Sequence, residues 1–447
     1  MIKINFYEDE VYKMSMTYEE AMEYIESVGR FGSNYGLRRT FRLLEILGNP
    51  QEKLKLIHVA GTNGKGSTTA MITKMLRGLG YKIGMYTSPY LEEFEERIQI
   101  NGVNIRKDTF VELLEEVKKA VDKVIEENYD HPTEFEILTA LMFLYFYNER
   151  VDYGVIEVGI GGTMDSTNVL TPVISVITSI SMDHMNILGD TIEEIAKQKG
   201  GIIKQNIPVV LYPQEKKVEE VISKIAKEKN SELHLVKNDS GKLIKINREK
   251  VYQEVQVRGI NDIYNINLPL LGEHQILNLT VAMNTVEILL NNENKYASKN
   301  LIEKSLEDVE WKGRLEVLHK EPFVVIDGAH NIDGIKSLRR NIEKYFKYNN
   351  MYLLLGILAD KQVGEMIKEI TPMAKKIYAL TPHSERAELS EDLRKEILKY
   401  NKNVVATENY EDALEEVITE AKKDDLILVS GSLYMIGDMR KIIRNKW

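Results

Sequence analysis

The sequence predicts an α/β protein of two domains, each built on a mostly parallel β-sheet. Short apolar segments alternate with amphipathic helical segments in both halves of the chain, as is typical of parallel sheets covered by helices. A polar stretch at residues 291–300, nearly free of large aliphatic side chains, separates the halves and reads as a linker. We therefore expect a first domain at residues 1–295 and a smaller second domain at residues 296–447.

The first half begins its alternation with a short apolar strand, Leu56–Ala60, that leads into a glycine-rich turn. Apolar residues from Ile72 to Leu79 follow at i, i+3, i+4 and i+7, and Gly80 suits the position just past the end of a helix. Uniformly apolar, β-branched runs indicate strands covered on both faces. These patterns predict, in chain order, a helix over Phe110–Val124, strands at Val155–Val158 and Val173–Ile180, and a helix over Val218–Ala226.

The stretch from Glu232 to Leu271 differs because its apolar runs are short and alternating. It predicts a small, more antiparallel β section appended to the first domain. A dense helix, Ile276–Leu290, follows. Beyond the linker the alternation restarts, with strands predicted at Phe323–Ile326, Tyr352–Leu355, Lys376–Leu380, Asn403–Ala406 and Leu426–Val429.

The composition excludes several classes of protein. The 447 residues are 43% hydrophobic and 29% charged, an ordinary globular balance, and the net charge of −10 argues against a general nucleic-acid binder. The lack of cysteine excludes disulfides, thiolate metal sites and a cysteine nucleophile. Met1–Met14 has no apolar signal core, and the longest strongly apolar stretch, Ile137–Tyr147, falls short of the ~20 residues that cross a bilayer and predicts a buried helix. We expect a cytoplasmic protein without nucleic-acid or membrane contacts.

A glycine-rich loop, Gly61–Thr68, lies between the first predicted strand and its helix. In this setting backbone N–H groups turn inward around phosphate oxygens, the helix N-terminus adds partial positive charge, and Lys65 supplies a full charge. The strict P-loop pattern ends in Gly-Lys-Ser/Thr, whereas Gly66 follows the lysine here, so a metal's hydroxyl ligand has to come from elsewhere. We predict that the phosphates of ATP bind at Thr62, Asn63, Gly64, Lys65, Gly66 and Ser67.

Eight motifs follow one another between about residue 35 and residue 440. They are Gly61–Thr68, Thr87–Leu91, Glu157–Gly162 with Asp165–Asn168, Asp183–Met185 with Lys199–Lys204, Gly272–Gln275 with Asn278, Trp311–Glu316, Asp327–Asn331, and Ser430–Tyr434. In this order they resemble the folylpolyglutamate synthase family, a branch of the Mur ligases. The resemblance implies a P-loop ATPase domain with a parallel sheet, a smaller Rossmann-like α/β domain after it, and an active site in the cleft between them.

The resemblance implies ATP-dependent amide ligation. The γ-phosphate of ATP passes to a carboxylate of a folate, and the amino group of L-glutamate attacks the resulting acyl phosphate, so that folylpoly-γ-glutamate is built. Formation of dihydrofolate from dihydropteroate is left open as a second activity. This chemistry needs positioning and charge neutralisation rather than a protein nucleophile. The family also implies a monomer whose partners are the small-molecule substrates ATP, folate and L-glutamate.

The family's metal and catalytic residues fall on positions that this sequence retains. By resemblance, Ser88 and Glu157 bind one Mg²⁺, Glu157 and His184 bind a second, and Lys199 occupies the place of a carbamylated lysine. Lys65, Glu157, His184 and Lys199 are thus the expected catalytic groups. The alternatives are a Glu157 that pairs with Lys or Arg, a structural His184, and a Lys199 that is an ordinary helix lysine.

The second half of the molecule is expected to complete the nucleotide site and to hold the acceptor. Asn278, Arg314 and Asp327 correspond to family residues that contact the nucleotide, although Arg314 has the alternative of a surface salt bridge with Glu316. His330 and Ser432 correspond to candidates for binding the incoming glutamate.

The pteroyl substrate is expected at the segment around Thr133 and Phe135, which resembles the lining of the family's pterin pocket. For Phe135, stacking on a flat ring and packing in a helix core are equally good explanations. The sequence departs from the family pattern at Thr163 (usually Arg), Tyr90 (often His) and Asn186 (frequently Glu), which leaves the fine specificity open.

Two other functions compete with the main prediction. Another Mur-type amide ligase, acting for instance on a nucleotide-sugar peptide, would usually carry a separate domain before the phosphate loop, for which the sequence leaves little room. A non-catalytic ATP-binding protein would not need to keep Lys65, Ser88, Glu157, His184 and Asp327 together.

Overall fold

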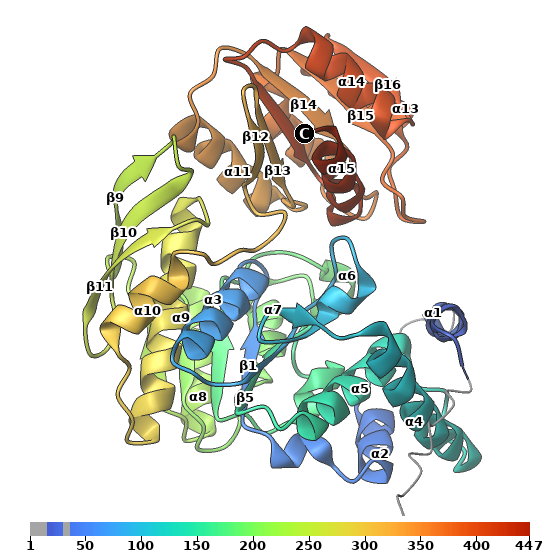
Figure 1. The fold of residues 1–447 in the computed structure, drawn as a ribbon, viewed down its shortest axis with the longest axis vertical. Coiled ribbons are helices and arrows are strands. Elements are labelled where there is room, and N and C mark those ends of the chain that lie inside the picture. The colour runs from blue at the N-terminus through green and yellow to red at the C-terminus, as the bar shows by residue number, and fades with distance from the viewer. Residues whose placement is uncertain (1–15, 30–35) are drawn as a thin grey trace, which may run out of the picture.

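The computed structural model describes residues 16–29 and 36–447, so the predicted absence of a signal core in Met1–Met14 concerns residues outside this part. Two α/β domains lie one above the other, joined along one side by a small antiparallel sheet (Figure 1). Among the described residues, no helix has the length and apolar character needed to span a membrane. The predicted α/β class with two sheet domains is confirmed.

The first domain is built on an eight-stranded sheet with the order β4-β3-β2-β5-β1-β6-β7-β8. From β2 to β8 the neighbouring strands are parallel, while β3 and β4 add an antiparallel edge. The strands are β1 (Leu56–Ala60), β2 (Ile83–Tyr86), β3 (Ile98–Ile100), β4 (Val103–Asn104), β5 (Tyr153–Glu157), β6 (Ile174–Ile177), β7 (Val209–Leu211) and β8 (Leu233–Leu235).

Helices cover both faces of this sheet because its strands are apolar on both sides. In β1, Ile57 and Val59 enter one hydrophobic cluster, whereas Leu56 and Ala60 enter clusters on the opposite face. The first face carries α3 (Lys65–Gly78), α9 (Glu273–Asn292) and α10 (Lys299–Leu306). The other face carries α1 (Tyr18–Gly29), α2 (Arg38–Ile46), α4 (Lys107–Glu126), α5 (Glu134–Asn148), α6 (Met185–Leu188), α7 (Ile192–Gly200) and α8 (Lys216–Glu228).

The antiparallel section predicted between Glu232 and Leu271 is present, with one difference. It forms the sheet β11-β10-β9 from β9 (Gly241–Asn247), β10 (Tyr252–Arg258) and β11 (Ile263–Leu268). The first strand that falls within this section, β8, instead pairs in parallel with β7 and extends the main sheet. The difference is tertiary in origin, since β8 follows helix α8 and completes a βαβ crossover.

The second domain is a six-stranded sheet with the order β12-β13-β17-β14-β15-β16, parallel except for the edge strand β12. Its strands are β12 (Glu316–Lys320), β13 (Phe323–Asp327), β14 (Met351–Leu355), β15 (Lys376–Leu380), β16 (Val404–Thr407) and β17 (Leu426–Ser430). Helices α11 (Ile332–Tyr345), α12 (Val363–Ile370) and α13 (Ser390–Ile397) cover one face, and α14 (Tyr410–Glu420) and α15 (Leu433–Lys446) cover the other. All five strands predicted here are present, and β12 is an additional one.

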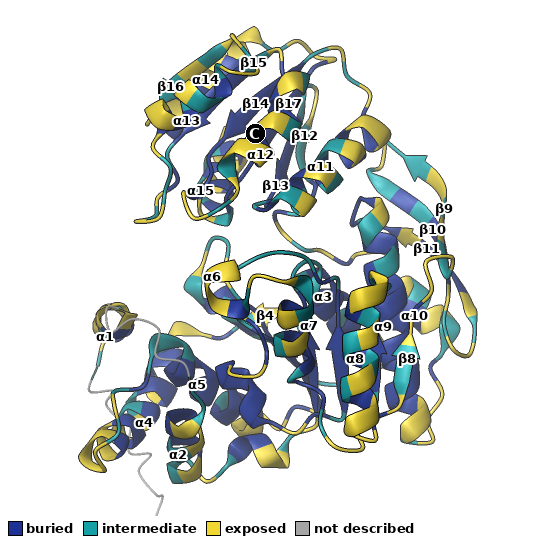
Figure 2. Ribbon diagram, turned by 180° about the vertical axis from the view of Figure 1, so that it is seen from behind, coloured by how far each residue is buried: buried dark blue, intermediate teal, exposed yellow. Residues whose placement is uncertain are grey.

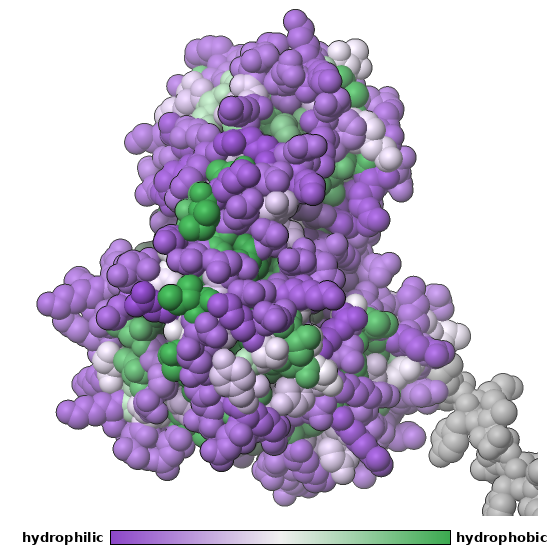
Figure 3. All heavy atoms as spheres, turned by 60° about the vertical axis from the view of Figure 1, so that its left-hand side comes forward, coloured by the Kyte–Doolittle hydropathy of each residue, from purple (hydrophilic) through white to green (hydrophobic). Residues whose placement is uncertain are grey.

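Burial follows this layered arrangement. The strands are buried in the middle of each domain, and the helices expose their outer sides (Figure 2). The side of the molecule seen in Figure 3 is mostly hydrophilic, with apolar side chains near the waist between the domains.

The chain crosses between the domains after α10. Ile302 and Leu306 of α10 lie in the same hydrophobic cluster as α3 and α9, and the crossing segment at residues 307–315 follows. The domain boundary between residues 295 and 296, predicted from composition, stays a prediction. Because α10 packs on the first domain, the structure supports a boundary somewhat later in the chain.

Candidate functional site

Both sheets direct the carboxyl ends of their parallel strands into one cleft of about 1370 Å³. The first domain contributes the loops after β1, β2, β5 and β6, and the second contributes the loops after β13, β14 and β17. Ligands of α/β sheets bind at this end of the strands, where helix N-termini and loop N–H groups converge. The cleft is therefore the candidate site.

The glycine-rich loop after β1 forms one wall of the cleft. A Cβ on Gly61 would lie 1.8 Å from Thr178 Oγ1, and Gly64 has a φ of +87°, so both positions require glycine. The N–H groups of Thr62 and Asn63 donate to Ser179 O at 2.7 and 3.2 Å, which ties the loop to the end of β6. The Lys65 ammonium donates to Gly61 O at 3.2 Å and Thr62 O at 3.3 Å, so its charge lies in the mouth of the loop.

A buried amide network braces this loop from α9. Gln275 Nε2 donates to Ser67 Oγ at 3.1 Å, and Gln275 Oε1 accepts from Asn278 Nδ2 at 3.0 Å. The side chain of Asn278 lies so close to Gly64 that a Cβ there would be 2.5 Å from Asn278 Oδ1. The structure thus brings Asn278 and Ser67 together, as the predicted ATP site requires, and adds Gln275, to which no role was predicted.

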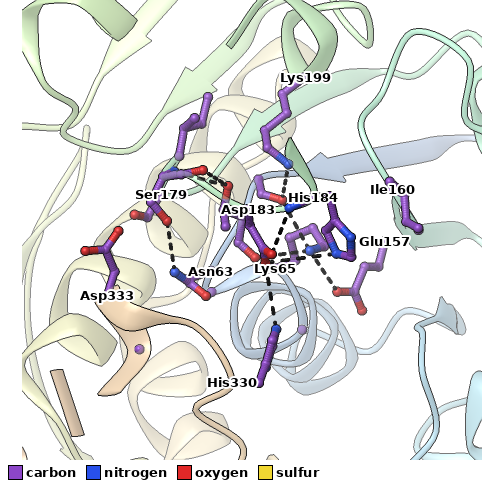
Figure 4. Close-up of a pocket in the computed structure, with 18 of the residues that line it drawn as sticks. Asn63, Lys65, Glu157, Ile160, Ser179, Asp183, His184, Lys199, His330 and Asp333 are labelled. Atoms are coloured by element: carbon purple, nitrogen blue, oxygen red, sulfur yellow. Dashed lines mark hydrogen bonds and ion pairs between the residues drawn. The ribbon is translucent and has the colours of Figure 1, made fainter. Parts of the chain in front are cut away.

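Glu157 ends β5 with a carboxylate that is only 5% exposed. Lys65 Nζ is 4.0 Å from Glu157 Oε1, and the Ser88 N–H donates to Glu157 Oε2 at 3.4 Å. Burial raises the pKa of Glu157 to about 7, because these contacts and the charge of Arg314 compensate the desolvation only in part. The alternative to metal binding, in which Glu157 pairs with a Lys or Arg, is therefore represented only by this 4.0 Å contact with Lys65. Glu157, His184 and Lys65 lie near one another in Figure 4.

Asp183 joins the two domains at the middle of the cleft. Lys361 Nζ lies 2.9 Å from Asp183 Oδ1, and Asn331 Nδ2 donates to Asp183 Oδ2 at 3.3 Å. His330 Nε2 is 3.9 Å from the same carboxylate, and His184 Nε2 is 4.0 Å from it. These cationic and polar neighbours from both domains hold the pKa of Asp183 well below its usual range although burial opposes them.

Lys199 is a buried lysine, 4% exposed, and not a solvated helix lysine. Its Nζ donates to Gly61 O at 2.8 Å, directly behind the phosphate loop (Figure 4). Burial, and to a lesser degree repulsion from Lys65, lowers the pKa of Lys199 to about 7. Near neutral pH a large fraction of this amine is therefore uncharged.

Arg314, Asp327, His330 and Ser432 all line the cleft from the second domain. Asp327 accepts from the N–H groups of Leu315 at 2.8 Å and Ala329 at 2.9 Å, so it orders the loop around Arg314. The predicted alternative partner of Arg314, Glu316, is instead bound by Arg440 at 2.7 Å.

His330 and Ser432 present unused hydrogen-bonding capacity to the cleft. His330 Nδ1 lies 2.8 Å from Gly328 O, which assigns the proton to Nδ1 and leaves Nε2 as an acceptor while the ring is neutral. Burial lowers the pKa of His330 to about 4. Ser432 is fully buried before α15, and its Oγ has no hydrogen-bond partner among the described residues.

Thr133 and Phe135 lie on the opposite wall, where α5 begins. Thr133 forms a capping box with Glu136: Thr133 Oγ1 accepts from the Glu136 N–H at 3.3 Å, and the Glu136 carboxylate accepts from the Thr133 N–H at 2.7 Å. Phe135 packs against Tyr86, with ring centroids 6.0 Å apart, and against Gly159, yet it also lines the cleft. Core packing and exposure to a ligand therefore coexist at Phe135.

The donors around Glu157 suit a hard divalent cation such as Mg²⁺. In the part of the chain that the structure describes, no three His, Asp or Glu side chains are arranged to hold a metal by themselves. In the predicted set of Ser88, Glu157 and His184, only Glu157 and His184 belong to these residue types. Phosphate oxygens and water would therefore have to complete the coordination, as is usual for Mg²⁺. Of the three, the imidazole of His184 is the least typical magnesium ligand.

Lys361 is the main cleft residue for which no role was predicted. It follows β14 in the segment Gly356–Lys361, and its side chain is only 8% exposed. The charged pair Asp360-Lys361, which follows the apolar run that continues from β14 to Leu358, was the available signal. No pattern within the sequence relates Lys361 to Asp183, because 178 residues separate them.

Comparisons with known proteins agree with this geometry. The family model of the Mur ligase middle domain matches residues 59–286, and that of the Mur ligase, glutamate ligase domain matches residues 313–433. The chain is 36% identical over 438 residues to a dihydrofolate synthase/folylpolyglutamate synthase of Bacillus subtilis, covering 96% of this chain and 100% of that protein. It is 35% identical to a folylpolyglutamate synthase of Lacticaseibacillus casei, with 96% and 99% covered.

Solved structures show the same similarity in three dimensions. The Mycobacterium tuberculosis folylpolyglutamate synthase complexed with ADP superposes with a TM-score of 0.88 at 28% identity, covering 95% of this chain and 99% of that one. An FPGS–AMPPCP–folate complex superposes with a TM-score of 0.83 at 32% identity, again with 95% and 99% covered.

Proposed function

The chain belongs to the Mur ligase family, and from this premise we propose that it is an ATP-dependent ligase of the folylpolyglutamate synthase type. It joins L-glutamate to a carboxylate of a folate and forms ADP and phosphate. The similarity to folylpolyglutamate synthases extends over nearly the whole chain. The similar solved structures include one complexed with ADP and one complexed with AMPPCP and folate.

One observation carries this proposal: a single cleft brings together the phosphate loop, the buried Glu157 carboxylate and the cationic Arg314 of the other domain. Transfer of a phosphoryl group from ATP to a carboxylate concentrates negative charge, and this arrangement supplies fixed positive charge and N–H donors on both sides of it. A protein that only bound ATP would need the loop but not the partner charges across the cleft.

We assign the first half-reaction mainly to residues of the first domain, with Arg314 and Asp327 contributed by the second. The N–H groups of Gly61–Ser67 and the Lys65 ammonium bind the phosphates of ATP, and Asn278, Arg314 and Asp327 complete the nucleotide site. Ser88, Glu157 and His184 would hold Mg²⁺, which neutralises phosphate charge when bound. The partly compensated charge of Glu157 supports this assignment, since a cation beside it would remove the cost of its burial.

For the second half-reaction we assign the incoming glutamate to the second domain. The unpaired Ser432 hydroxyl and the neutral, buried His330 offer a donor and an acceptor in the cleft that also contains the Asp183–Lys361 pair. Thr133 and Phe135 stand on the opposite wall, where the flat rings of the pteroyl group would lie. In this assignment the glutamate amine would meet the activated carboxylate between the two walls.

Carbamylation of Lys199 fits its surroundings. Carbon dioxide adds only to an uncharged amine, and the lowered pKa of Lys199, about 7, provides one near neutral pH. Conversion to a carbamate would also give an anion that attracts Lys65, where a protonated Lys199 repels it. A density map at high resolution would test this modification: an amine tip with no added atoms would refute it.

The decisive assay measures phosphate release with ATP, magnesium, L-glutamate and tetrahydrofolate, with dihydropteroate assayed in parallel as the carboxylate donor. Release that depends on both the folate and glutamate is expected. Release that ignores both would reject the ligase assignment. Activity with dihydropteroate would add dihydrofolate synthesis, the second activity in the name of the Bacillus subtilis relative.

The phosphate loop has its own test. Lys65→Ala removes the ammonium group at the mouth of Gly61–Ser67, so we expect turnover to fall by at least roughly a hundredfold while the protein stays folded. Near-normal turnover would show that the phosphates bind elsewhere.

The state of the protein in solution stays a prediction. One chain supplies both walls of the cleft, which supports the expected monomer. The cytoplasmic location predicted from the sequence likewise stays a prediction.

A further inference from the structure

Gly66, the second residue of α3, has a neighbour that explains why it is glycine. A Cβ built on Gly66 would lie 2.4 Å from Cζ2, 2.6 Å from Cε2 and 2.8 Å from Nε1 of Trp311. The φ of Gly66 is outside the left-handed region, so its backbone would accept any residue. The position is glycine because an indole ring occupies the space of a side chain. This contact accounts for the departure from the Gly-Lys-Ser/Thr pattern.

Trp311 belongs to the segment that connects α10 to β12 and thus carries the chain from one domain to the other. This connection passes beside α3 in Figure 1. The Trp311 side chain packs against the hydrophobic core of the first domain, whereas Gly313, two residues later, already accepts a hydrogen bond from Gly328 of the second. Trp311 is therefore the apolar contact that holds the crossing segment on the first domain.

The residues directly after Trp311 are held tightly up to Arg314. Lys312 Nζ lies 2.7 Å from Glu96 Oε1, the Gly313 N–H donates to Glu316 Oε2 at 2.8 Å, and Gly313 O accepts from the Gly328 N–H at 2.8 Å. A short, braced segment between Trp311 and Arg314 has little freedom to absorb a shift. We therefore expect a displacement of the indole to be passed on to the guanidinium.

We propose that Trp311 is a positioning residue: by resting its indole on Gly66 it sets the place of Arg314 relative to the phosphate loop. The role of Arg314 in catalysis is the one part of this inference that rests on the proposed function. The contact between Trp311 and Gly66, and its response to nucleotide, do not depend on which carboxylate is ligated.

The steric part of the proposal is tested with Gly66→Ala, alone and combined with Trp311→Leu. With Trp311 present, the added methyl group overlaps the indole, and we expect kcat/KM for ATP to fall roughly tenfold or more. In the Trp311→Leu protein the same methyl group should cost less than about twofold, because a smaller side chain leaves room for it. Equal losses in both backgrounds would overturn the proposal.

Gly364→Ala is the matched control. Gly364 is likewise the second residue of a helix, α12, and nothing lies within 4 Å of a Cβ built there. Its replacement should leave kcat/KM unchanged, which separates the steric effect from the general effect of alanine in a first helical turn.

The transmission to Arg314 is tested by a double-mutant cycle on kcat. We expect Trp311→Leu to lower kcat roughly tenfold when Arg314 is present and less than about twofold in an Arg314→Ala protein. Equal factors in the two backgrounds would show that Trp311 does not act through Arg314.

A spectroscopic measurement needs no turnover and works even if a core variant folds poorly. The chain has 2 tryptophans, and the other, Trp447, stacks on His319 with ring centroids 4.2 Å apart in the second domain. In a Trp447→Phe protein the emission of Trp311 should change on titration with magnesium and ADP in the absence of folate and glutamate. Unchanged emission despite ADP binding by calorimetry would overturn the proposal. Loss of folate-dependent turnover with this response intact would reject the proposed function instead.

Discussion

Burying a charged side chain in the cleft lowers the stability of the folded protein. Glu157 illustrates this, since its carboxylate is buried at the end of β5 with Lys65 at 4.0 Å and no closer cation among the described residues. Its pKa is raised to about 7, so in the absence of ligands the ionised form destabilises the folded state. Such a cost is typical of a group kept for ligand binding.

This cost makes a prediction for Glu157→Gln in the absence of metal and nucleotide. At pH 8 wild-type Glu157 is ionised in both states, and the neutral amide avoids its desolvation, so we expect the variant to be more stable by up to roughly 3 kcal/mol. Because the folded-state pKa is raised above 4.5, the difference should shrink as the pH falls from 7 towards 4.5. Urea unfolding at several pH values measures it.

The same Glu157→Gln variant should lose magnesium-dependent turnover while it gains stability. An unchanged dependence of turnover on magnesium would remove Glu157 from the metal site. A stability difference that does not vary with pH would contradict the assigned shift.

At the scale of elements, the loop after β2 is held by the second domain. Glu96 accepts from the N–H groups of Leu91 at 2.8 Å and Glu92 at 3.3 Å and closes the turn after Ser88. Arg440 of α15 reaches across from the other domain: it lies 2.8 Å from Glu92 and 2.7 Å from Glu316, and its side chain is 8% exposed. The loop that carries the predicted metal hydroxyl is thus docked on α15.

Arg440→Met should therefore weaken both stability and metal use. It leaves the Glu92 and Glu316 carboxylates close together without their shared cation, and breaking a buried pair of this kind typically costs about 3–5 kcal/mol. We expect a lower Tm and a higher magnesium concentration for half-maximal turnover. Lys446→Met on the same helix is the control, since its pair with Glu415 is largely exposed and should contribute little. Equal effects of the two variants would contradict this account.

At the scale of the whole molecule, the Asp183–Lys361 pair spans the cleft from the loop after β6 to the loop after β14. Both side chains are 8% exposed, and His330 and Asn331 of the second domain approach the same carboxylate. These contacts favour the arrangement in which both walls face one another. We expect catalysis to depend on this arrangement more than nucleotide binding does, because the phosphate loop belongs entirely to the first domain.

Lys361→Met should accordingly reduce kcat by roughly tenfold to a hundredfold and change the dissociation constant of ADP much less. Steady-state kinetics and calorimetry give the two quantities. Lys423→Met in the same domain is a control, because its pair with Glu321 is exposed on both sides. Equal losses in kcat and ADP affinity would show that Lys361 acts on nucleotide binding and not on the closed arrangement.

Much of the fold could be predicted because its signals are local. The apolar run Leu56–Ala60 is β1 residue for residue, and the helical spacing from Ile72 to Leu79 lies in and just after α3. Strand β12 escaped prediction because its residues are only partly buried and lack an apolar run. The membership of β8 in the main sheet depends on pairing with β7, which local composition does not encode.

The sequence by itself determined the class of fold, the phosphate loop and the set of motifs that the cleft assembles, since these depend on short-range patterns of glycine, charge and apolar spacing. Only the tertiary structure decided which groups act on one another. Three interactions in the cleft join residues that are far apart in the chain. They are the packing of Trp311 on Gly66, the hydrogen bond from Gln275 to Ser67 and the ion pair of Lys361 with Asp183. The physical reason is that burial and electrostatic interaction depend on distance in space, and packing of the two domains sets that distance.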